Sequence, residues 1–433
     1  MNKELMVKVG TVALLALVLL LPIGMIRDLV SERQGRRDEA VNGIAEAWGK
    51  RQVISTPYIL VTYERHWTEV RRETVNGKAI EQRNERSETR ALRLPSSAID
   101  WTVSADISEK ARGIYKARLY AARLEARGTI ALPKRASLED GTSRYKWGTP
   151  ILVLGISDPL GIRSAPGLQA VEALHPFAPG SGDGIAGVHA PLPLQVLWRA
   201  PALEYALSVD VAGSEAFSIA PMGADTSVAL RANWPHPSFQ GRFLPAKHAI
   251  GPEGFTASWK VSRFARLEGS RTGDHISVSF IEPAGLYQQL ERASKYGFLF
   301  IGLTFAAFAL LELLRRLAIH PVQYALVGLA LAMFFLLLTA LSEHIAFGAA
   351  YAVATAACVG VITPYLARVL QSARLALAFG TALGGLYAIL YVLLRAEDYA
   401  LLGGTLVLFA LLAAAMLATR RVDWYRLTRL QPQ

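Results

Sequence analysis

The stretch from His320 to His344 places the strongest constraint on the fold of this chain. Between Pro321 and Leu341 it contains no charged residue. A helix needs about 20 such residues to cross the roughly 30 Å hydrocarbon core of a bilayer, so this stretch predicts a transmembrane helix. Arg315 and Arg316 precede it, and short loops keep Lys and Arg on the cytoplasmic side. The helix is therefore expected to run outward.

Five further apolar runs have the length of a transmembrane helix. They are Val9 to Ile26, Tyr296 to Leu314, Ile345 to Ala367, Leu375 to Leu394 and Tyr399 to Ala418. The first run follows Lys3 and Lys8 and lacks a small-residue cleavage site, so we interpret it as an uncleaved signal anchor. Lys and Arg gather at the helix ends that this topology makes cytoplasmic. Six spans with both termini in the cytoplasm are therefore predicted.

The composition requires a second, more polar part. The 433 residues are 52% hydrophobic but also 19% charged, which is too polar for a pure membrane bundle. A long segment such as Arg27 to Lys295 translocates largely regardless of its charge, so we expect it in the periplasm. The lone cysteine, Cys358, lies in an apolar run, so this segment must fold without a disulfide. The net charge of +11 is shared between the segment and basic membrane loops, which argues against a nucleic-acid partner.

The periplasmic segment has the pattern of an antiparallel β protein. Apolar and polar residues alternate from Ile59 to Glu64, and Asn76 with Gly77 is the pair that a two-residue hairpin turn prefers. Short apolar runs then recur between clusters of Gly, Pro, Ser and Asp, which favours a sandwich-like architecture. These runs are Ile151 to Ile156, Gly184 to His189, Tyr205 to Val211, Ser227 to Ala232, Phe255 to Val261 and Ile276 to Phe280.

Two stretches allow more than one interpretation. From Ser31 to Trp48, apolar residues at helical spacing form one stripe, either of a stalk helix docked on the domain or of a helix lying on the membrane surface. From Arg112 to Arg127, the composition favours helix, but the side chains alternate and change phase once. A bulged strand accounts for both phases, so we predict a strand there.

The sequence therefore predicts a membrane protein of the α+β class with four parts. They are a signal-anchor helix at 1–27, a β-rich periplasmic domain with a helical stalk at 28–294, a five-helix transmembrane bundle at 295–419 and a basic cytoplasmic tail at 420–433.

Motifs for catalysis or cofactor binding are absent or lack their context. No nucleophile elbow, H-E-x-x-H or phosphate-binding loop occurs. The G-x-G-x-x-G match at Gly182 to Gly187 is flanked by prolines, which indicates a loop. Ser143 and Lys146 match S-x-x-K, but the residues that follow stop a helix. The periplasmic histidines have no ligand spacing, so we predict no catalytic, cofactor or metal site.

Two places carry candidate binding residues. In NWPHPSF, prolines fix the backbone on either side of His236, which indicates either a packed turn or a preformed recognition site. The candidate residues of this turn are Asn233, Trp234, His236 and Phe239. Glu343 and His344 lie between two spans at the outer face. They form either a plain polar turn or a site that relays protons or binds a headgroup.

Three segments carry a resemblance to a known family. The membrane stretch from His320 to His344, NWPHPSFQGRFLPAK at 233–247 and RRVDWYRL at 420–427 are similar to the CreD family of bacterial inner-membrane proteins, often called cell envelope integrity proteins. The similarity extends from end to end and is weakest between residues 65 and 150. It implies an inner-membrane location and a part in envelope integrity or the response to envelope damage, with no established reaction.

The leading hypothesis is a non-enzymatic one. The periplasmic domain binds an envelope component or protein, and the bundle anchors it in the lipid bilayer or receives its signal. The alternative is a transporter or flippase for a lipid or small solute. Several buried charged pairs or broken helices would favour it, and the candidates are Glu312 and the pair Glu343 and His344. An envelope hydrolase is the third class. The ligand, the oligomeric state and the direction of signalling stay open at this point.

Overall fold

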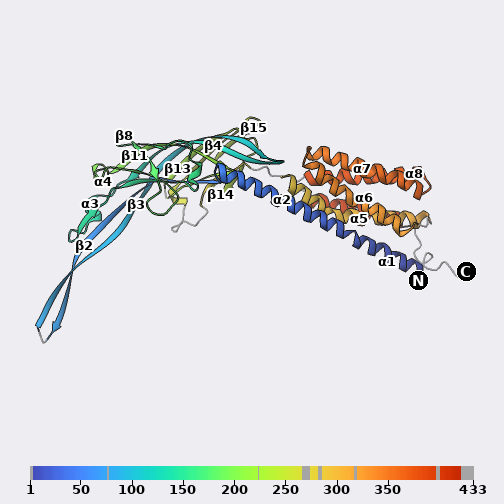
Figure 1. The fold of residues 1–433 in the computed structure, drawn as a ribbon, viewed down its shortest axis with the longest axis horizontal. Helices are drawn as coiled ribbons and strands as arrows, with labels where there is room; N and C mark the ends of the chain where they lie inside the picture. Colours follow the sequence, from blue (N-terminus) through green and yellow to red (C-terminus); the bar gives the residue numbers. More distant parts are fainter. Residues whose placement is uncertain are drawn as a thin grey trace. The chain divides into compact units, whose positions relative to one another are not determined.

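The computed structural model describes residues 3–75, 78–222, 224–265, 274–280, 285–315, 319–395 and 400–420. They belong to two compact units (Figure 1). The helical unit comprises residues 1–38 and 284–433, and the β-rich unit comprises residues 39–283. The predicted turn at Asn76 and Gly77 and the tail beyond Arg420 lie outside the described residues.

The helical unit confirms a membrane protein with several apolar helices. Its helices are α1 (Lys3–Val18), the first part of α2 (Leu20–Trp48), α5 (Leu286–Arg315), α6 (Pro321–Ser342), α7 (Phe347–Val369), α8 (Ala373–Arg395) and α9 (Ala400–Thr419). Within the described ranges, five helical segments are long and apolar enough to cross a membrane: Gly10–Trp48, Leu286–Glu312, Pro321–Ser342, Phe347–Val369 and Ala373–Arg395. The sixth predicted span coincides with α9, and the count of six stays a prediction.

Local chemistry explains where these helices begin and break. At the start of α6, the His320 side chain accepts a hydrogen bond from the Val322 amide, and the Gln323 side chain accepts one from the His320 amide. This reciprocal pair satisfies two amides that the first helical turn leaves free. The interruption between α1 and α2 follows Val18. Pro22 has no amide to donate to the Val18 carbonyl, which accounts for the break.

An aromatic cluster fills the centre of the helical unit. α6 packs against α1, α5 and α7, and α8 packs against α5, α7 and α9. Between them, the Tyr387 ring lies 4.3 Å from that of Phe334 and 4.7 Å from that of Phe300, measured between centroids. The Tyr351 hydroxyl donates to the Tyr387 carbonyl at 2.7 Å. These contacts join four helices.

The β-rich unit confirms the predicted fold class for this part of the chain. Its strands are β1 (Gln52–Ser55), β2 (Tyr58–Val75), β3 (Lys78–Arg112), β4 (Tyr115–Ala131), β5 (Arg144–Trp147), β6 (Ile151–Gly155), β7 (Gly167–Ala170), β8 (Ala173–Pro176), β9 (Ala178–Pro179), β10 (Gly187–Pro191), β11 (Ala202–Ser214), β12 (Ala216–Ala220), β13 (Asp225–Ala232), β14 (Ser238–Gly241), β15 (Lys247–Gly251), β16 (Gly254–Val261) and β17 (Ile276–Ser279). Short helices are α3 (Arg135–Leu138), α4 (Val196–Arg199), η1 (Pro159–Gly161) and η2 (Arg263–Ala265).

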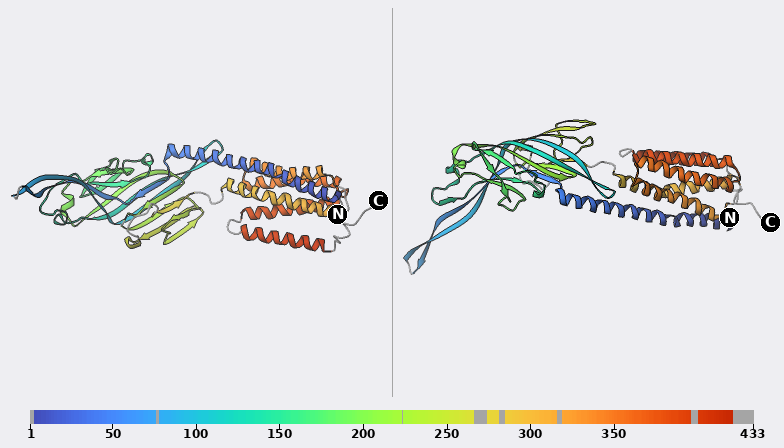
Figure 2. Two further views of the ribbon diagram at one scale, coloured as in Figure 1. Left: turned by 90° about the horizontal axis from the view of Figure 1, so that it is seen from below. Right: turned by 45° about the horizontal axis from the view of Figure 1, so that its top comes forward.

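The long strand β3 joins two groups of strands. Up to Pro95 it pairs with β2, and beyond Ala98 it pairs with β4 on one side and in parallel with β13 on the other. The register shifts between Ser96 and Ala98, so Ser97 is an extra residue at the point where the partners change. β2 and the first part of β3 extend beyond the other strands as a two-stranded hairpin (Figure 2).

Two sheets share one core in this unit. Among the described strands, a 13-stranded sheet follows the order β8-β7-β11-β4-β3-β2-β6-β10-β9, with β13, β16 and β15 attached beside β3 and β5 beside β2. A four-stranded sheet follows the order β1-β12-β17-β14. Trp101 and Leu124 of the large sheet and Phe217 and Val278 of the small sheet belong to one buried cluster. This shared core holds the two sheets face to face.

The predicted stalk helix docks on the sheet. Its stripe residues Val41, Ile44 and Trp48 pack on Ala117 and Leu119 of β4. The helix ends at Trp48, directly before Gly49, whose φ is 135°. The docked interpretation of the stripe is therefore confirmed for residues 39–48.

The strand prediction for Arg112 to Arg127 is confirmed from Tyr115 onward, after a turn at residues 113 and 114, but the predicted bulge within it is wrong. β4 pairs with β3 without a register shift from Tyr115 to Thr129. Leu119 is buried under the α2 stripe on one face, whereas Tyr120 is buried in the main core on the other. The hydrophobic pattern changes phase because the covered face of the strand changes, not because a residue is inserted.

Candidate functional site

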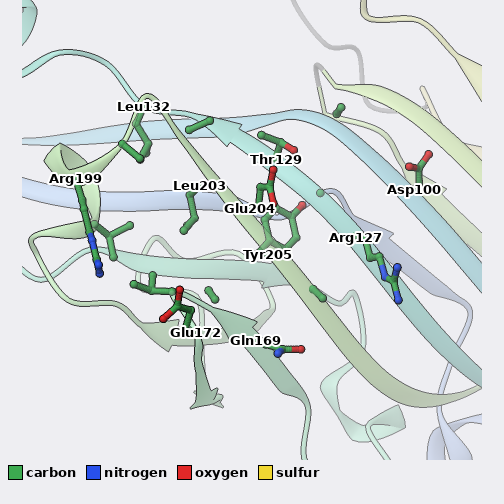
Figure 3. Close-up of a pocket in the computed structure, with 18 residues that line it drawn as sticks. Asp100, Arg127, Thr129, Leu132, Gln169, Glu172, Arg199, Leu203, Glu204 and Tyr205 are labelled. Atoms are coloured by element: carbon green, nitrogen blue, oxygen red, sulfur yellow. The ribbon is translucent and has the colours of Figure 1, made fainter.

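An open groove lies on the outward face of the large sheet (Figure 3). Its volume is about 820 Å³, within the range of roughly 300–1,000 Å³ that is typical of ligand sites. β3, β4, β11 and β7 form its floor, and the segment around α4 forms part of its rim. Successive side chains of a strand point to opposite faces, so this floor is the polar side of strands whose other side is core. The charged residues that line it are Asp100, Arg127, Glu172, Arg199 and Glu204.

Arg127 lies in the middle of the floor. In the strand register it stands between Asp100 of β3 and Ala206 of β11, and Ala206 stands beside Gln169 of β7. Arg127, Asp100 and Gln169 come from three different strands in the close-up of Figure 3. The small side chain of Ala206 fills little space above the sheet, so the groove is deeper at this point.

The charged side chains of the groove are available to a ligand. Within the described parts of the chain, none of the five forms an ion pair or a side-chain hydrogen bond. Outside the groove, by contrast, Arg123 of β4 and Asp210 of β11 are paired, and Arg123 Nε donates to Asp210 Oδ1 at 3.0 Å. That hydrogen bond holds the pKa of the Asp210 carboxyl below its ordinary value. The groove therefore differs from its surroundings in keeping charges of both signs unpaired.

The rim of the groove carries backbone strain. Val171 and Glu172 connect β7 to β8 with φ values of 52° and 60°. A two-residue hairpin turn of this kind favours Asn and Gly, because positive φ brings a side chain into conflict with the backbone. A β-branched residue such as Val is a clear outlier there. Strain of this sort is often found at binding sites, which supports a functional role for the groove.

A second hollow continues the same outward face beyond β3. Its volume is about 520 Å³, and it lies over β3, β13, β16 and β15. Arg231 and Lys247 line it, together with hydroxyl side chains, and its described lining contains no carboxylate. We call the outward side of β7, β11, β4, β3, β13, β16 and β15 the polar face. It has mixed charge at one end and positive charge at the other.

The predicted recognition turn begins at the end of β13. The Asn233 side chain accepts a hydrogen bond from the Ile107 amide at 2.7 Å, which ties the turn to β3. The Trp234 indole donates to the His236 carbonyl at 2.8 Å, and the Arg118 guanidinium lies 4.6 Å from the centroid of its ring. The backbone of the turn is therefore held by its own side chains.

The rest of the turn separates into a packed and an exposed part. The Phe239 ring packs against Phe255 and Trp259, with centroid distances of 5.7 and 5.8 Å. The His236 ring, in contrast, is exposed to solvent. Among the aromatic members of the predicted set, His236 is thus the exposed one that a partner can reach.

The structure does not bring Glu343 and His344 together. Glu343 Oε1 accepts a hydrogen bond from the Tyr287 hydroxyl at 3.2 Å, and Glu343 Oε2 lies 3.5 Å from Arg33 Nη1. Only 8% of the Glu343 side chain is exposed, whereas His344 is an exposed residue. Glu343 therefore joins α6 to α2 and α5.

The two weak motif matches have ordinary roles. Lys146 lies on strand β5 and its Nζ is 3.5 Å from Glu64 Oε2, while the Ser143 hydroxyl donates to Asp140 at 2.8 Å. The glycine-rich segment is the loop before β10, as predicted. No group of three or more His, Cys, Asp or Glu side chains suited to a metal occurs among the residues that the structure describes.

The groove itself was not predicted from the sequence. Asp100, Arg127 and Glu204 each occupy an ordinary outward position on a strand, and such positions are usually polar. Only the strand register shows that they share one surface. One feature of the sequence points to the groove. The tight turn between two short strands contains Val171 and Glu172 in place of the usual Asn or Gly.

Comparisons with known proteins give two clear similarities. A family model described as inner membrane protein CreD matches residues 4–425. The inner membrane protein CreD of Escherichia coli (strain K12) is 34% identical over 423 residues, which cover 94% of this chain and 91% of that protein. Among solved structures, a mutant M1 zinc metallopeptidase from Deinococcus radiodurans has 10% identity and a TM-score of 0.21, covering 47% of this chain and 53% of that chain. A TM-score this low supports no structural argument.

Proposed function

The chain belongs to the CreD family of inner membrane proteins, which confirms the resemblance seen in its sequence, and we propose that it acts in cell envelope integrity as a non-enzymatic binding protein. In this proposal, residues 28–294 face the periplasm and bind an envelope component or a periplasmic protein. The helices anchor this domain in the bilayer.

The proposed topology rests on the distribution of basic residues. Arg315, Arg316, Arg368 and Arg374 flank the apolar runs at the ends that we assign to the cytoplasm. Reporter fusions after Arg316, Arg374 and Arg429 should therefore read cytoplasmic, and fusions near Gly141, Glu343 and Glu397 should read periplasmic. A periplasmic signal after Arg429 would mean an odd number of spans and would overturn the topology.

The proposal that the β-rich unit binds a ligand rests on the polar face. Its groove holds unpaired guanidinium and carboxylate groups, and its second hollow adds Arg231 and Lys247. Such a surface suits an extended polar ligand with charges of both signs. Each charge of the ligand can pair with an opposite charge of the protein, and no ion pair within the protein has to break first. The turn with His236 follows β13 directly and borders the basic end of this face.

In-cell photo-crosslinking tests the proposal. A photoreactive residue at Arg127 or His236 should capture an envelope component or protein, and the same residue at Arg83 on the exposed hairpin serves as a control. Arg127→Ala combined with Glu204→Gln should remove protection against envelope damage at normal protein abundance, while Arg83→Ala should not. Full protection by the double variant, with no product captured at Arg127, would sink the proposal.

The packing of the helices supports anchoring over transport. A transport pathway is expected to place polar or ionisable groups near the middle of the membrane. In the described helices, the middle of the bundle holds the Phe334, Tyr351 and Tyr387 rings. Glu312 and Glu343 lie near helix ends, where Glu312 accepts a hydrogen bond from the Ile319 amide, two residues before α6 begins.

A further inference from the structure

A polar pocket lies between α2 and α5 within the helical unit. Its volume is about 470 Å³. One wall is a stripe of α2 at helical spacing, and Glu291 of α5 lies on the other side. The α2 residues that line it are Gly24, Arg27, Asp28, Val30, Ser31 and Gln34.

The position of the pocket follows from the apolar runs of the two helices. The run in α2 ends at Ile26, directly before Arg27, and the run in α5 begins at Tyr296, after Glu291. A side chain added at Gly297 would meet Ile23, so the two helices lie together just inside these limits. The end of an apolar run marks the boundary between hydrocarbon and headgroups. The pocket therefore lies at the level of the lipid headgroups.

The pocket holds charged side chains of both signs that a ligand can reach. Arg27 and Asp28 are exposed and, among the residues that the structure describes, neither has an ion-pair partner. Glu291 forms an ion pair with Lys295, with an Oε1–Nζ distance of 2.8 Å, and also attracts the Arg27 guanidinium at longer range. Ser31 and Gln34 add a hydroxyl and an amide. The pocket thus offers a guanidinium and a carboxylate, both exposed, beside neutral hydrogen-bonding groups.

The α2 wall of the pocket is fixed in place. Arg33, two residues beyond Ser31, pairs with Glu343 at the end of α6, and the Tyr287 hydroxyl of α5 donates to the same carboxylate. These contacts join α2 to both neighbours just outside the pocket. A preformed site loses less conformational entropy when a ligand binds.

We propose that this pocket binds the headgroup of phosphatidylethanolamine. Arg27 pairs with the phosphate, and Asp28 accepts hydrogen bonds from the ammonium group. Phosphatidylcholine offers the same two charges, but its quaternary ammonium has no N–H to donate. Phosphatidylglycerol offers the phosphate and no cation. The arrangement therefore selects phosphatidylethanolamine over both.

Native mass spectrometry of the delipidated full-length chain in detergent tests the proposal by titration with each of the three lipids. Arg27→Ala and Asp28→Asn should each weaken phosphatidylethanolamine binding roughly tenfold, the factor that loss of a hydrogen bond to a charged group predicts. Asp28→Asn should also bring its affinity close to that of phosphatidylcholine. Arg36→Ala is the matched control, because Arg36 lies on the same helix outside the pocket and pairs with Glu32 on the surface.

Several outcomes would overturn the proposal. Equal affinity for phosphatidylethanolamine and phosphatidylglycerol would remove the role of Asp28, and an equal loss in Arg36→Ala would indicate a general charge effect. Displacement of the lipid by inorganic phosphate alone would show a site for the free anion. If Arg27→Ala does not fold, Asp28→Asn decides through the preference for phosphatidylethanolamine over phosphatidylcholine.

Discussion

Replacement of Trp234 should destabilise the β-rich unit, whereas replacement of His236 should not. The Trp234 ring is partly buried against the core, lies under the Arg118 guanidinium and donates a hydrogen bond to the His236 carbonyl. That bond uses the backbone of His236, so a substitution there retains it. The His236 ring makes one edge contact with the Trp234 ring, at 6.1 Å between centroids, and is otherwise exposed.

The size of the effect follows from these contacts. Loss of a fully buried Trp costs about 3–5 kcal/mol, and roughly half of this applies to a partly buried ring. The guanidinium contact adds about 0.5–1 kcal/mol and the hydrogen bond about 1 kcal/mol. Trp234→Ala should therefore lower the free energy of unfolding by about 3–4 kcal/mol. His236→Ala should change it by less than about 0.5 kcal/mol.

Pulse proteolysis of the full-length protein in increasing urea measures both values. The same variants, compared for membrane abundance and for protection against envelope damage, separate structure from recognition. If His236→Ala removes protection at full abundance, the turn takes part in recognition. A loss near 3 kcal/mol in His236→Ala, or none in Trp234→Ala, would refute the assignment of structural and exposed roles.

Three further predictions concern the turn at the groove, a buried carboxylate and a helix contact. Replacing Glu172 with Gly should raise the free energy of unfolding by about 1 kcal/mol, because Glu172 holds a positive φ and is exposed, whereas Val171 also packs against the core; a lower urea midpoint would contradict this. Burial by itself would raise the pKa of the Asp183 carboxyl. The hydrogen bonds that this carboxylate accepts, the first from the Tyr58 hydroxyl, outweigh burial and lower its pKa. A lowered folded pKa gives stability that is present above the unfolded pKa and is lost as the pH falls through the folded one. In Asp183→Asn, the free energy of unfolding should therefore fall less steeply with decreasing pH below about pH 4. Urea titrations at several pH values measure this, and the same pH dependence in both proteins would count against the prediction. Gly380→Leu should lower the melting temperature in detergent, since a side chain there collides with α7. Gly384→Leu is the control and should change it less, because a side chain there meets open space. Equal melting temperatures of the two variants would contradict the predicted contact.

The binding groove shows why sites on sheets are hard to predict from sequence. Asp100 and Arg127 belong to neighbouring strands and stand side by side only because β3 and β4 pair in one register. A shift of one residue would turn Arg127 toward the core, so the register and the site are set together. The hydrophobic pattern predicts which face of each strand is buried. It does not predict which outward residues become neighbours.

The sequence by itself determined the apolar helices, the stripe on α2 and most strands, because these depend on periodicity within a short stretch of chain. Tertiary structure decided which surfaces cover which faces. Leu119 and Tyr120 are buried on opposite sides of β4 because a helix covers one side and the core covers the other. Glu343 pairs with Arg33 and not with its neighbour His344 for the same reason, since packing between helices brings residues together that lie far apart in the chain.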